Sequence, residues 1–218
     1  MNVACIKSGS RYRADYVNRL YSMVARHLHA PFKFYCYTDK AEGVREEVIC
    51  RPLYYAFDPP WWDKLWLFKP LPELADDYLL AIDLDVVITS SLDFLTYYRG
   101  SFCGLRHWHD PTAWNGSMWL LKPGYLTEVW EDFIDDAWAI MNRLYSDQEW
   151  LSEKIPVADD FETIAPGKVL GFKDHYWKQK LTDGQRTFTD TGSIWVFHGL
   201  PKPHEVVKSI PWVKEHWQ

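Results

Sequence analysis

The first third of the chain alternates apolar and polar segments in a strand–helix–strand order. Between Tyr12 and Leu28, apolar residues recur at the spacing of an amphipathic helix, which Pro31 brings to an end. Short apolar runs on either side of this helix predict strands at residues 3–6, 32–38 and 47–50. This order is typical of the opening of a wound α/β sheet.

The rest of the chain continues the α/β pattern. Residues 78–82 (YLLAI) are uninterrupted apolar residues, as in a strand that is buried on both faces. Helices are predicted from Trp62 to Phe68, over 124–142 and at the segment DQEWLSEK. Further strands are predicted at 86–88, 101–105, 117–121 and 194–197. No repeat or low-complexity linker interrupts this pattern, so we expect a single α/β domain.

Composition adds one unusual feature, which is the aromatic content. The 218 residues include 13 Trp, 13 Tyr and 11 Phe, or 17% of the chain. Flat aromatic faces suit sugars and nucleobases as well as hydrophobic cores. A Trp-rich core accounts for most of these residues without any ligand.

Charge is distributed unevenly along the chain. The net charge of −6 argues against general coating of nucleic acid. Residues 1–33 nevertheless hold six Lys and Arg against Asp15 alone, a local charge of +5. Such an edge suits an anionic ligand, or it is simply the solvated face of a helix.

Neither disulfide bonds nor a zinc site is predicted. The four cysteines show no CxxC spacing and lie in apolar runs, where free buried thiols are the default: Cys5, Cys36, Cys50 and Cys103. Residues 107–110 (HWHD) lack the further Cys or His ligands that zinc needs, and we interpret them as an aromatic, polar loop. The N-terminus reaches polar residues too early for a signal peptide, and no apolar run approaches the ~18 residues of a membrane span. We expect a cytoplasmic protein.

Two carboxylates two residues apart are the sharpest candidate for chemistry. Asp83 and Asp85 follow the apolar strand 78–82 directly. Ligands of open α/β sheets bind at the carboxyl ends of strands, and paired carboxylates suit Mg²⁺ or Mn²⁺ that also contacts substrate phosphates. The alternative is a solvated strand end, and the preceding apolar run favours the functional interpretation.

A second candidate lies where the strand 194–197 ends. His198 is followed by Gly199, which permits close backbone approach, and by Lys202, a point charge that suits a diphosphate. A lone histidine is more often a structural residue.

Two further segments have simple structural explanations. Asp147 and Gln148 open a predicted helix, where Ser146 or Asp147 would serve as the N-cap. Asn115 and Gly116 precede a predicted strand and would form only a turn.

The order of these motifs resembles that of metal-dependent glycosyltransferases of the GT-A fold, in the group of glycogenin and the bacterial lipopolysaccharide galactosyl- and glucosyltransferases. The resemblance spans roughly residues 1–203, from VACIKSG through WWDKLWLF, AIDLDVVI, WNGSMWLLKPG and SDQEWL to VFHGLPKP. It implies a Rossmann-like domain with a mixed, mostly parallel central sheet flanked by helices. It further implies a nucleotide-binding half (1–85), a donor-sugar and acceptor half (86–203) and a C-terminal tail (204–218).

The resemblance also implies roles for matching positions. Asp83, Asp85 and His198 would bind the Mn²⁺ or Mg²⁺ ion, and Gly199 and Lys202 would hold the diphosphate of the donor. The positions implied for the nucleobase and ribose are Lys7, Ser8 and Tyr12. Lys64 would lie near the phosphate or the donor sugar. Asn115 and Gly116 would border the donor sugar, with Asp147 and Gln148 beside its anomeric carbon.

The closing motif departs from the family pattern, which is H-x-x-G-x-x-K-P-W. Here His198 and Gly199 are adjacent, and His204 replaces the tryptophan. The relatives imply a uridine diphosphate sugar as donor and retention of anomeric configuration. An inverting enzyme would instead need a general base, for which Asp110, Asp147 and Glu149 are candidates. The acceptor stays open between a glycan, a protein, a small molecule and a modified DNA base.

Two alternative functions also fit parts of the sequence. The segment AIDLDVVIT matches the signature of aspartyl-nucleophile phosphatases, in which Asp83 would be phosphorylated and Asp85 would act as the acid/base. About eighty residues precede it, however, whereas that signature belongs to a first strand. The third possibility is a non-catalytic binder of sugar nucleotides whose stacking platforms would be Trp61, Trp62, Trp108, Trp114 and Trp119.

Overall fold

The computed structural model describes residues 1–178 and 192–218, and its largest element is a mixed sheet of seven strands. These strands are β1 (Asn2–Lys7), β2 (Lys33–Thr38), β3 (Ile49–Pro52), β4 (Leu79–Ile82), β6 (Phe102–His107), β7 (Asp110–Leu121) and β8 (Asp159–Asp160). Their order is β3-β2-β1-β4-β7-β6-β8. Only β7 runs antiparallel to its two neighbours, β4 and β6. The expected mixed, mostly parallel sheet is confirmed.

A second, smaller sheet was not predicted from the sequence. It consists of β5 (Val86–Ile88), β9 (Val169–Gly171) and β10 (Ile194–Val196) in the order β5-β10-β9. The main chain changes partners across the acidic pair: Asp83 N–H donates to Ser117 O, whereas Asp85 O accepts from Phe197 N–H. The predicted strand at 86–88 therefore forms but belongs to another sheet.

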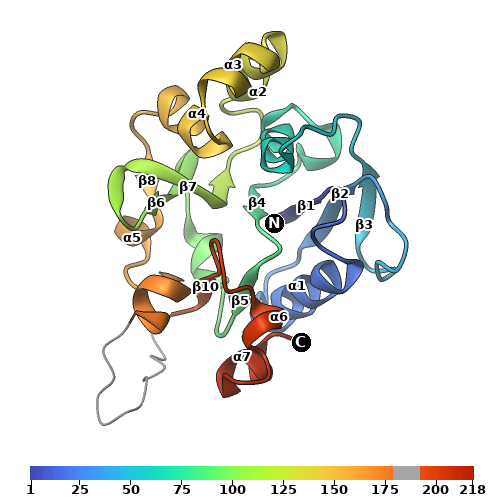
Figure 1. Cartoon of the computed structure of the whole chain (residues 1–218), viewed down its shortest axis with the longest axis vertical. Coiled ribbons are helices and arrows are strands. Elements are labelled where there is room, and N and C mark those ends of the chain that lie inside the picture. Colours follow the sequence, from blue (N-terminus) through green and yellow to red (C-terminus); the bar gives the residue numbers. More distant parts are fainter. Residues whose placement is uncertain (179–191) are drawn as a thin grey trace.

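Helices cover both faces of the large sheet (Figure 1). The α-helices are α1 (Ala14–His27), α2 (Glu128–Asp135), α3 (Ala137–Arg143), α4 (Asp147–Lys154), α5 (Phe161–Ile164), α6 (Pro203–Val206) and α7 (Pro211–His216). Tighter or wider helical turns are η1 (Pro60–Phe68), η2 (Pro72–Leu74), η3 (Asp93–Tyr97) and the π-helix η4 (Phe172–Trp177). No helix in the described ranges is long and apolar enough to cross a bilayer.

Two hydrophobic cores follow from the alternation of side chains along β1. Val3 and Cys5 face the core under α1 and α7, whereas Ala4 faces the core under η1 and α2–α4. In the second core the rings of Trp62 and Phe133 stack with centroids 5.4 Å apart. Burial on both faces explains why the parallel strands are apolar without interruption.

Local sequence signals account for several boundaries. The single helix expected over 124–142 is two helices, because the chain breaks at Asp136, whose carboxylate accepts the N–H of Ala139 and caps α3. Asn115 and Gly116 lie inside β7, so the interpretation as a turn is wrong. The four cysteines are free thiols, as expected. The division into halves at residue 85 stays a prediction.

Candidate active site

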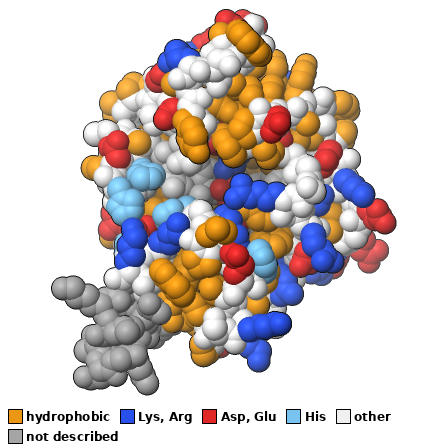
Figure 2. Space-filling view, in the orientation of Figure 1, with side chains coloured by type: hydrophobic (Ala, Val, Ile, Leu, Met, Phe, Trp, Pro, Cys, Tyr) orange, Lys and Arg blue, Asp and Glu red, His pale blue; other side chains and the backbone are white. Residues whose placement is uncertain are grey.

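A cavity of about 380 Å³ opens where β1 and β4 end, near the centre of the face seen in Figure 2. Of the residues that the resemblance assigns to the metal, the nucleotide and the donor sugar, all line it except Lys7 and Asn115. The predicted residues in its wall are Ser8, Tyr12, Lys64, Asp83, Asp85, Gly116, Asp147, Gln148, His198, Gly199 and Lys202. These residues come from six separate parts of the chain, which the topology brings to one edge of the sheet.

The two exceptions are buried, and each is a sequence neighbour of residues in the wall. Lys7 is buried, and its Nζ donates to the carbonyl of Lys40 at 2.9 Å. The buried Asn115 accepts the N–H of Ser117 through Oδ1 at 2.9 Å. Asn115 thereby positions Ser117, which lines the cavity, whereas Lys7 holds the main chain at Lys40, which does not line it.

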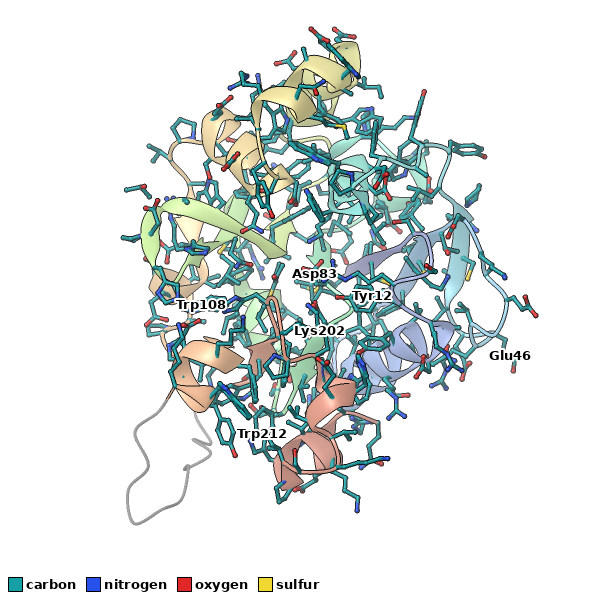
Figure 3. The ribbon with its side chains drawn as sticks, in the orientation of Figure 1. Tyr12, Glu46, Asp83, Trp108, Lys202 and Trp212 are labelled. Atoms are coloured by element: carbon teal, nitrogen blue, oxygen red, sulfur yellow. The ribbon has the colours of Figure 1, made fainter. Side chains whose placement is uncertain are left out.

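Each carboxylate of the acidic pair forms an ion pair with a lysine. Asp83 pairs with Lys64 of η1, whose Nζ also donates to Gly116 O at 2.5 Å. Asp85 pairs with Lys202, and its Oδ2 also accepts the hydroxyl of Tyr12 at 2.8 Å. Figure 3 shows Tyr12, Asp83 and Lys202 close together at the centre of the molecule.

Burial and charge shift the protonation equilibria of this cluster. Burial raises the pKa of Asp83 above its ordinary value, against the opposing charge of Lys64. Burial acts to lower the pKa of Lys64, but the carboxylates of Asp83 and Asp147 outweigh it and raise that pKa. Burial and the charge of Asp85 raise the pKa of Tyr12. Lys64 is therefore a cation and the Tyr12 hydroxyl a hydrogen-bond donor at neutral pH.

Asp147 is the first residue of α4 and is only 2% exposed. Burial raises its pKa to about 6, although the charge of Lys64 acts to lower it. Its Oδ2 finds no hydrogen-bond partner among the described residues. A Cβ at position 116 would lie 2.7 Å from this oxygen, so Gly116 provides the space that the carboxyl group occupies. Ser146 occupies the N-cap position of α4, as expected, and Asp147 lies in the first turn, but the side chain of Ser146 makes no capping hydrogen bond.

His198 lies against the loop at residues 107–110. Its Nε2 is 2.9 Å from Oδ2 of Asp174, and its ring stacks on Trp108 with centroids 5.0 Å apart. Asp174 also contacts His109 and Lys178 through Oδ1. Burial lowers the pKa of His198 below its ordinary value, although Asp174 acts to raise it. The HWHD loop therefore contacts the cavity wall through Trp108, which stacks on His198.

The cavity offers two carboxylate ligands to a divalent metal ion. Asp83 and Asp85 supply carboxylate oxygens, which Mg²⁺ and Mn²⁺ prefer and which often bind these ions together with substrate phosphates. Residues 1–178 and 192–218 contain no group of three or more His, Cys, Asp or Glu side chains placed to hold a metal by themselves. The chemistry of the pair therefore fits an ion that draws its remaining ligands from a bound diphosphate.

Seven residues of the cavity wall were not among the donor-site residues predicted from the sequence. These are Ile6, Arg11, Pro60, Trp61, Ser117, Tyr145 and Ser146. Tyr145 and Ser146 directly precede Asp147, and this position in the sequence was the signal that could have identified them as residues of the wall. Of the five tryptophans considered as platforms, Trp62, Trp114 and Trp119 are buried in the core, and only Trp61 lines the cavity.

Comparison with known proteins identifies the class of fold. No family model matches the chain, and no curated protein is similar in sequence. Solved structures of glycosyltransferases do match over most of the chain, which confirms the expected GT-A fold. The aspartyl-phosphatase alternative is not favoured by this result.

Three matched structures illustrate the similarity. An active-site mutant of LgtC superposes with a TM-score of 0.63 at 12% identity, covering 99% of this chain and 93% of LgtC. The bifunctional glycosyltransferase WbbM gives a TM-score of 0.60 at 10% identity, with 98% of this chain and 50% of WbbM covered. The glycosyltransferase GlyE of Streptococcus pneumoniae TIGR4 gives 0.54 at 13% identity, with 73% and 44% covered.

Proposed function

We propose that this protein transfers a hexose from a nucleotide diphosphate sugar, specifically a uridine diphosphate sugar, to a hydroxyl acceptor, with Mn²⁺ or Mg²⁺ and with retention of configuration. One observation carries the proposal: a single cavity gathers two carboxylates, two lysines and a buried third carboxyl group at the carboxyl ends of the strands. The fold supports it, because the matched structures are named as glycosyltransferases and one holds donor and acceptor sugar analogs.

The cationic side of the cavity suits the diphosphate. Breaking the bond between sugar and phosphate develops negative charge on the leaving group, which nearby lysines stabilise. Lys202 and Lys64 supply this charge, and Gly199, with φ of +66°, permits close approach of the main chain. A divalent ion held by Asp83 and Asp85, with its remaining ligands from the diphosphate, would neutralise further charge, and His198 would join it only by exchanging its contact with Asp174 for the ion.

The opposite end of the donor would lie along β7 and α4. Asp147 is ionised above its pKa of about 6 and would stabilise positive charge at the anomeric carbon. Gln148 and Gly116 line the wall beside it, and Asn115 lies directly behind. The nucleobase and ribose would bind where β1 ends, near Lys7, Ser8 and Tyr12.

A donor screen tests the proposal. UDP-glucose, UDP-galactose, UDP-N-acetylglucosamine and GDP-mannose are each added with and without Mn²⁺, and thermal shift and released nucleotide are measured. We expect one uridine diphosphate sugar to raise the Tm and to be hydrolysed slowly, both only with Mn²⁺. Asp85→Asn should abolish the metal-dependent shift. The absence of binding and release with all four donors would contradict the proposal.

A further inference from the structure

Several side chains beside the cavity converge on the carboxylate of Asp174, which belongs to the π-helix η4. Its Oδ2 lies 2.9 Å from Nε2 of His198. Its Oδ1 lies 3.0 Å from Nε2 of His109 and 2.9 Å from Nζ of Lys178. The side chain of Asp174 is only 10% exposed and does not line the cavity, whereas His198 does. Asp174 therefore reaches the candidate active site through the imidazole that it holds.

The surroundings of this carboxylate leave room for it and fix the ring that it contacts. A Cβ at Gly171, the last residue of β9, would lie 2.9 Å from Oδ2 of Asp174 and 3.0 Å from the ring of Trp108. The absence of a side chain at position 171 therefore makes space for both groups. The rings of Trp108 and His198 stack at an interplanar angle of 21°. The HWHD loop, β9 and η4 together determine where the imidazole lies.

The contact with Asp174 determines which nitrogen of His198 carries a proton. Asp174 also pairs with the ammonium group of Lys178, which favours its ionised form. An ionised carboxylate can only accept hydrogen bonds, so Nε2 of His198 must be the donor. A ring nitrogen that carries a proton has no lone pair for a metal ion. Nε2 can therefore serve Asp174 or an ion, but not both at once.

We propose that Asp174 is a positioning residue that competes with the divalent ion for Nε2 of His198 and thereby weakens the binding of that ion. This inference rests on the proposed metal-dependent transferase function. A hydrogen bond to a carboxylate is stronger than one between neutral groups, so His198 is free of Asp174 for only a fraction of the time. If that fraction is about one tenth, the apparent affinity for the ion is about tenfold lower than with a free imidazole.

Titration with Mn²⁺ tests the competition without requiring turnover. The full chain is titrated in the presence of UDP, and electron paramagnetic resonance measures the Mn²⁺ that stays free. Asp174→Ala should bind Mn²⁺ about tenfold more tightly than the parent. Asp174→Asn should give a smaller gain, because an amide oxygen still accepts a hydrogen bond from His198, although a weaker one. Loss of a negative charge alone predicts the opposite sign, since it weakens the binding of a cation.

Two controls isolate the contact between Asp174 and His198. His109→Gln removes another partner of the same carboxylate but keeps its contact with His198, so it should bind Mn²⁺ as the parent does. In a His198→Ala background there is no imidazole to release, so adding Asp174→Ala should not tighten binding. Far-UV circular dichroism verifies the folding of each variant, and Asp174→Asn is nearly isosteric with the parent if the alanine variant proves unstable.

Two outcomes would overturn the inference. One is an affinity for Mn²⁺ that is unchanged or lower in both Asp174 variants, where a lower value would mean that Asp174 supports His198 as a ligand. The other is a gain from Asp174→Ala that persists in the His198→Ala background. Calorimetry with UDP runs in parallel. A protein that binds UDP and Mn²⁺ but gains nothing from the Asp174 variants refutes the competition alone, whereas one that binds neither refutes the transferase function as well.

Discussion

Lys202 and Asp85 form a buried ion pair across 117 residues of sequence. The pair joins the segment after β10 to the end of β4, and Nζ of Lys202 also donates to Phe197 O at 3.0 Å. Tyr12 approaches the same carboxylate oxygen from the start of the chain. Three segments that are distant in sequence therefore meet at one carboxylate, so this contact stabilises the fold as well as shaping the cavity.

Replacing Lys202 by Met should destabilise the protein and weaken nucleotide binding. Removing one member of a buried ion pair leaves the other charge unpaired, which typically costs about 3 kcal/mol or more. The free energy of unfolding from urea denaturation should fall by about that amount, and the Kd for UDP should rise at least tenfold.

The double variant Lys202→Met/Asp85→Asn separates these two effects. It carries no unpaired charge at position 85, so it should recover part of the lost stability but none of the affinity for UDP. If the double variant is no more stable than Lys202→Met, the ion pair does not have the energetic role described.

Asp147→Asn should stabilise the protein at neutral pH while abolishing transfer. Burial raises the pKa of Asp147 from 3.8 to about 6, so the folded state binds a proton more tightly than the unfolded chain does. Stability from this group is present below pH 4 and is lost as the pH rises through 6, which costs on the order of 2–3 kcal/mol at pH 7.5. An uncharged side chain avoids that cost.

Thermal unfolding at a series of pH values measures this effect. Asp147→Asn should exceed the parent in Tm at pH 7.5, and the two should converge near pH 4. Asp135→Asn, a change at the exposed end of α2, is the matched control and should show no such convergence. Equal Tm values for Asp147→Asn and the parent at pH 7.5 would show that the carboxyl group is not strained by burial.

Lys64→Met should move the acidic limb of the pH–rate profile to higher pH. The charge of Lys64 acts to lower the pKa of Asp147, so its loss should raise that pKa further above 6. The ionised fraction of Asp147, and with it kcat/KM for donor hydrolysis, would then fall off at higher pH. Lys64→Arg keeps the charge and should keep the limb near pH 6. If Lys64→Met leaves the acidic limb at the same pH, the charge of Lys64 does not lower the pKa of Asp147 as described.

The sequence predicted the strands and helices that depend on local periodicity, and it missed features that depend on long-range pairing. β1, α1, β2 and β4 have clear apolar patterns and lie where they were expected. β8 and β9 are only two and three residues long, too short to show any period. The strand at Val86–Ile88 has an obvious apolar signal, but nothing local shows that it pairs with β10.

The candidate site shows the same distinction. Asp83, Asp85 and Asp147 were selected because motifs and strand ends are visible in sequence. The lysine that pairs with each carboxylate could not be predicted. Lys64 pairs with Asp83 and Lys202 with Asp85 because segments that are distant in sequence cross at this point. The HWHD loop was interpreted as aromatic and polar, which is correct, but its contact with His198 arises from the hairpin between β6 and β7.

Gly116→Ala should impair catalysis by displacing the carboxyl group of Asp147, although residue 116 does not bind that group. The added Cβ would lie 2.7 Å from Oδ2 of Asp147, closer than real contacts allow, and 3.2 Å from Cγ of Gln148, which is a tight contact. Because Asp147 is buried, its carboxyl group has little room to move, and such overpacking costs about 1–3 kcal/mol of stability. We expect kcat for donor hydrolysis to fall at least tenfold while KM changes little, since misplacement acts on the reacting centre.

A double-mutant cycle with Asp147→Ala identifies the cause. In that background the clashing oxygen is gone, so adding Gly116→Ala should cost much less stability than it does in the parent, with a coupling energy of about 1 kcal/mol. The urea midpoints of the four proteins measure it. Additive effects would mean that the alanine acts through the β7 backbone instead, and the space at position 116 would then not be what positions Asp147.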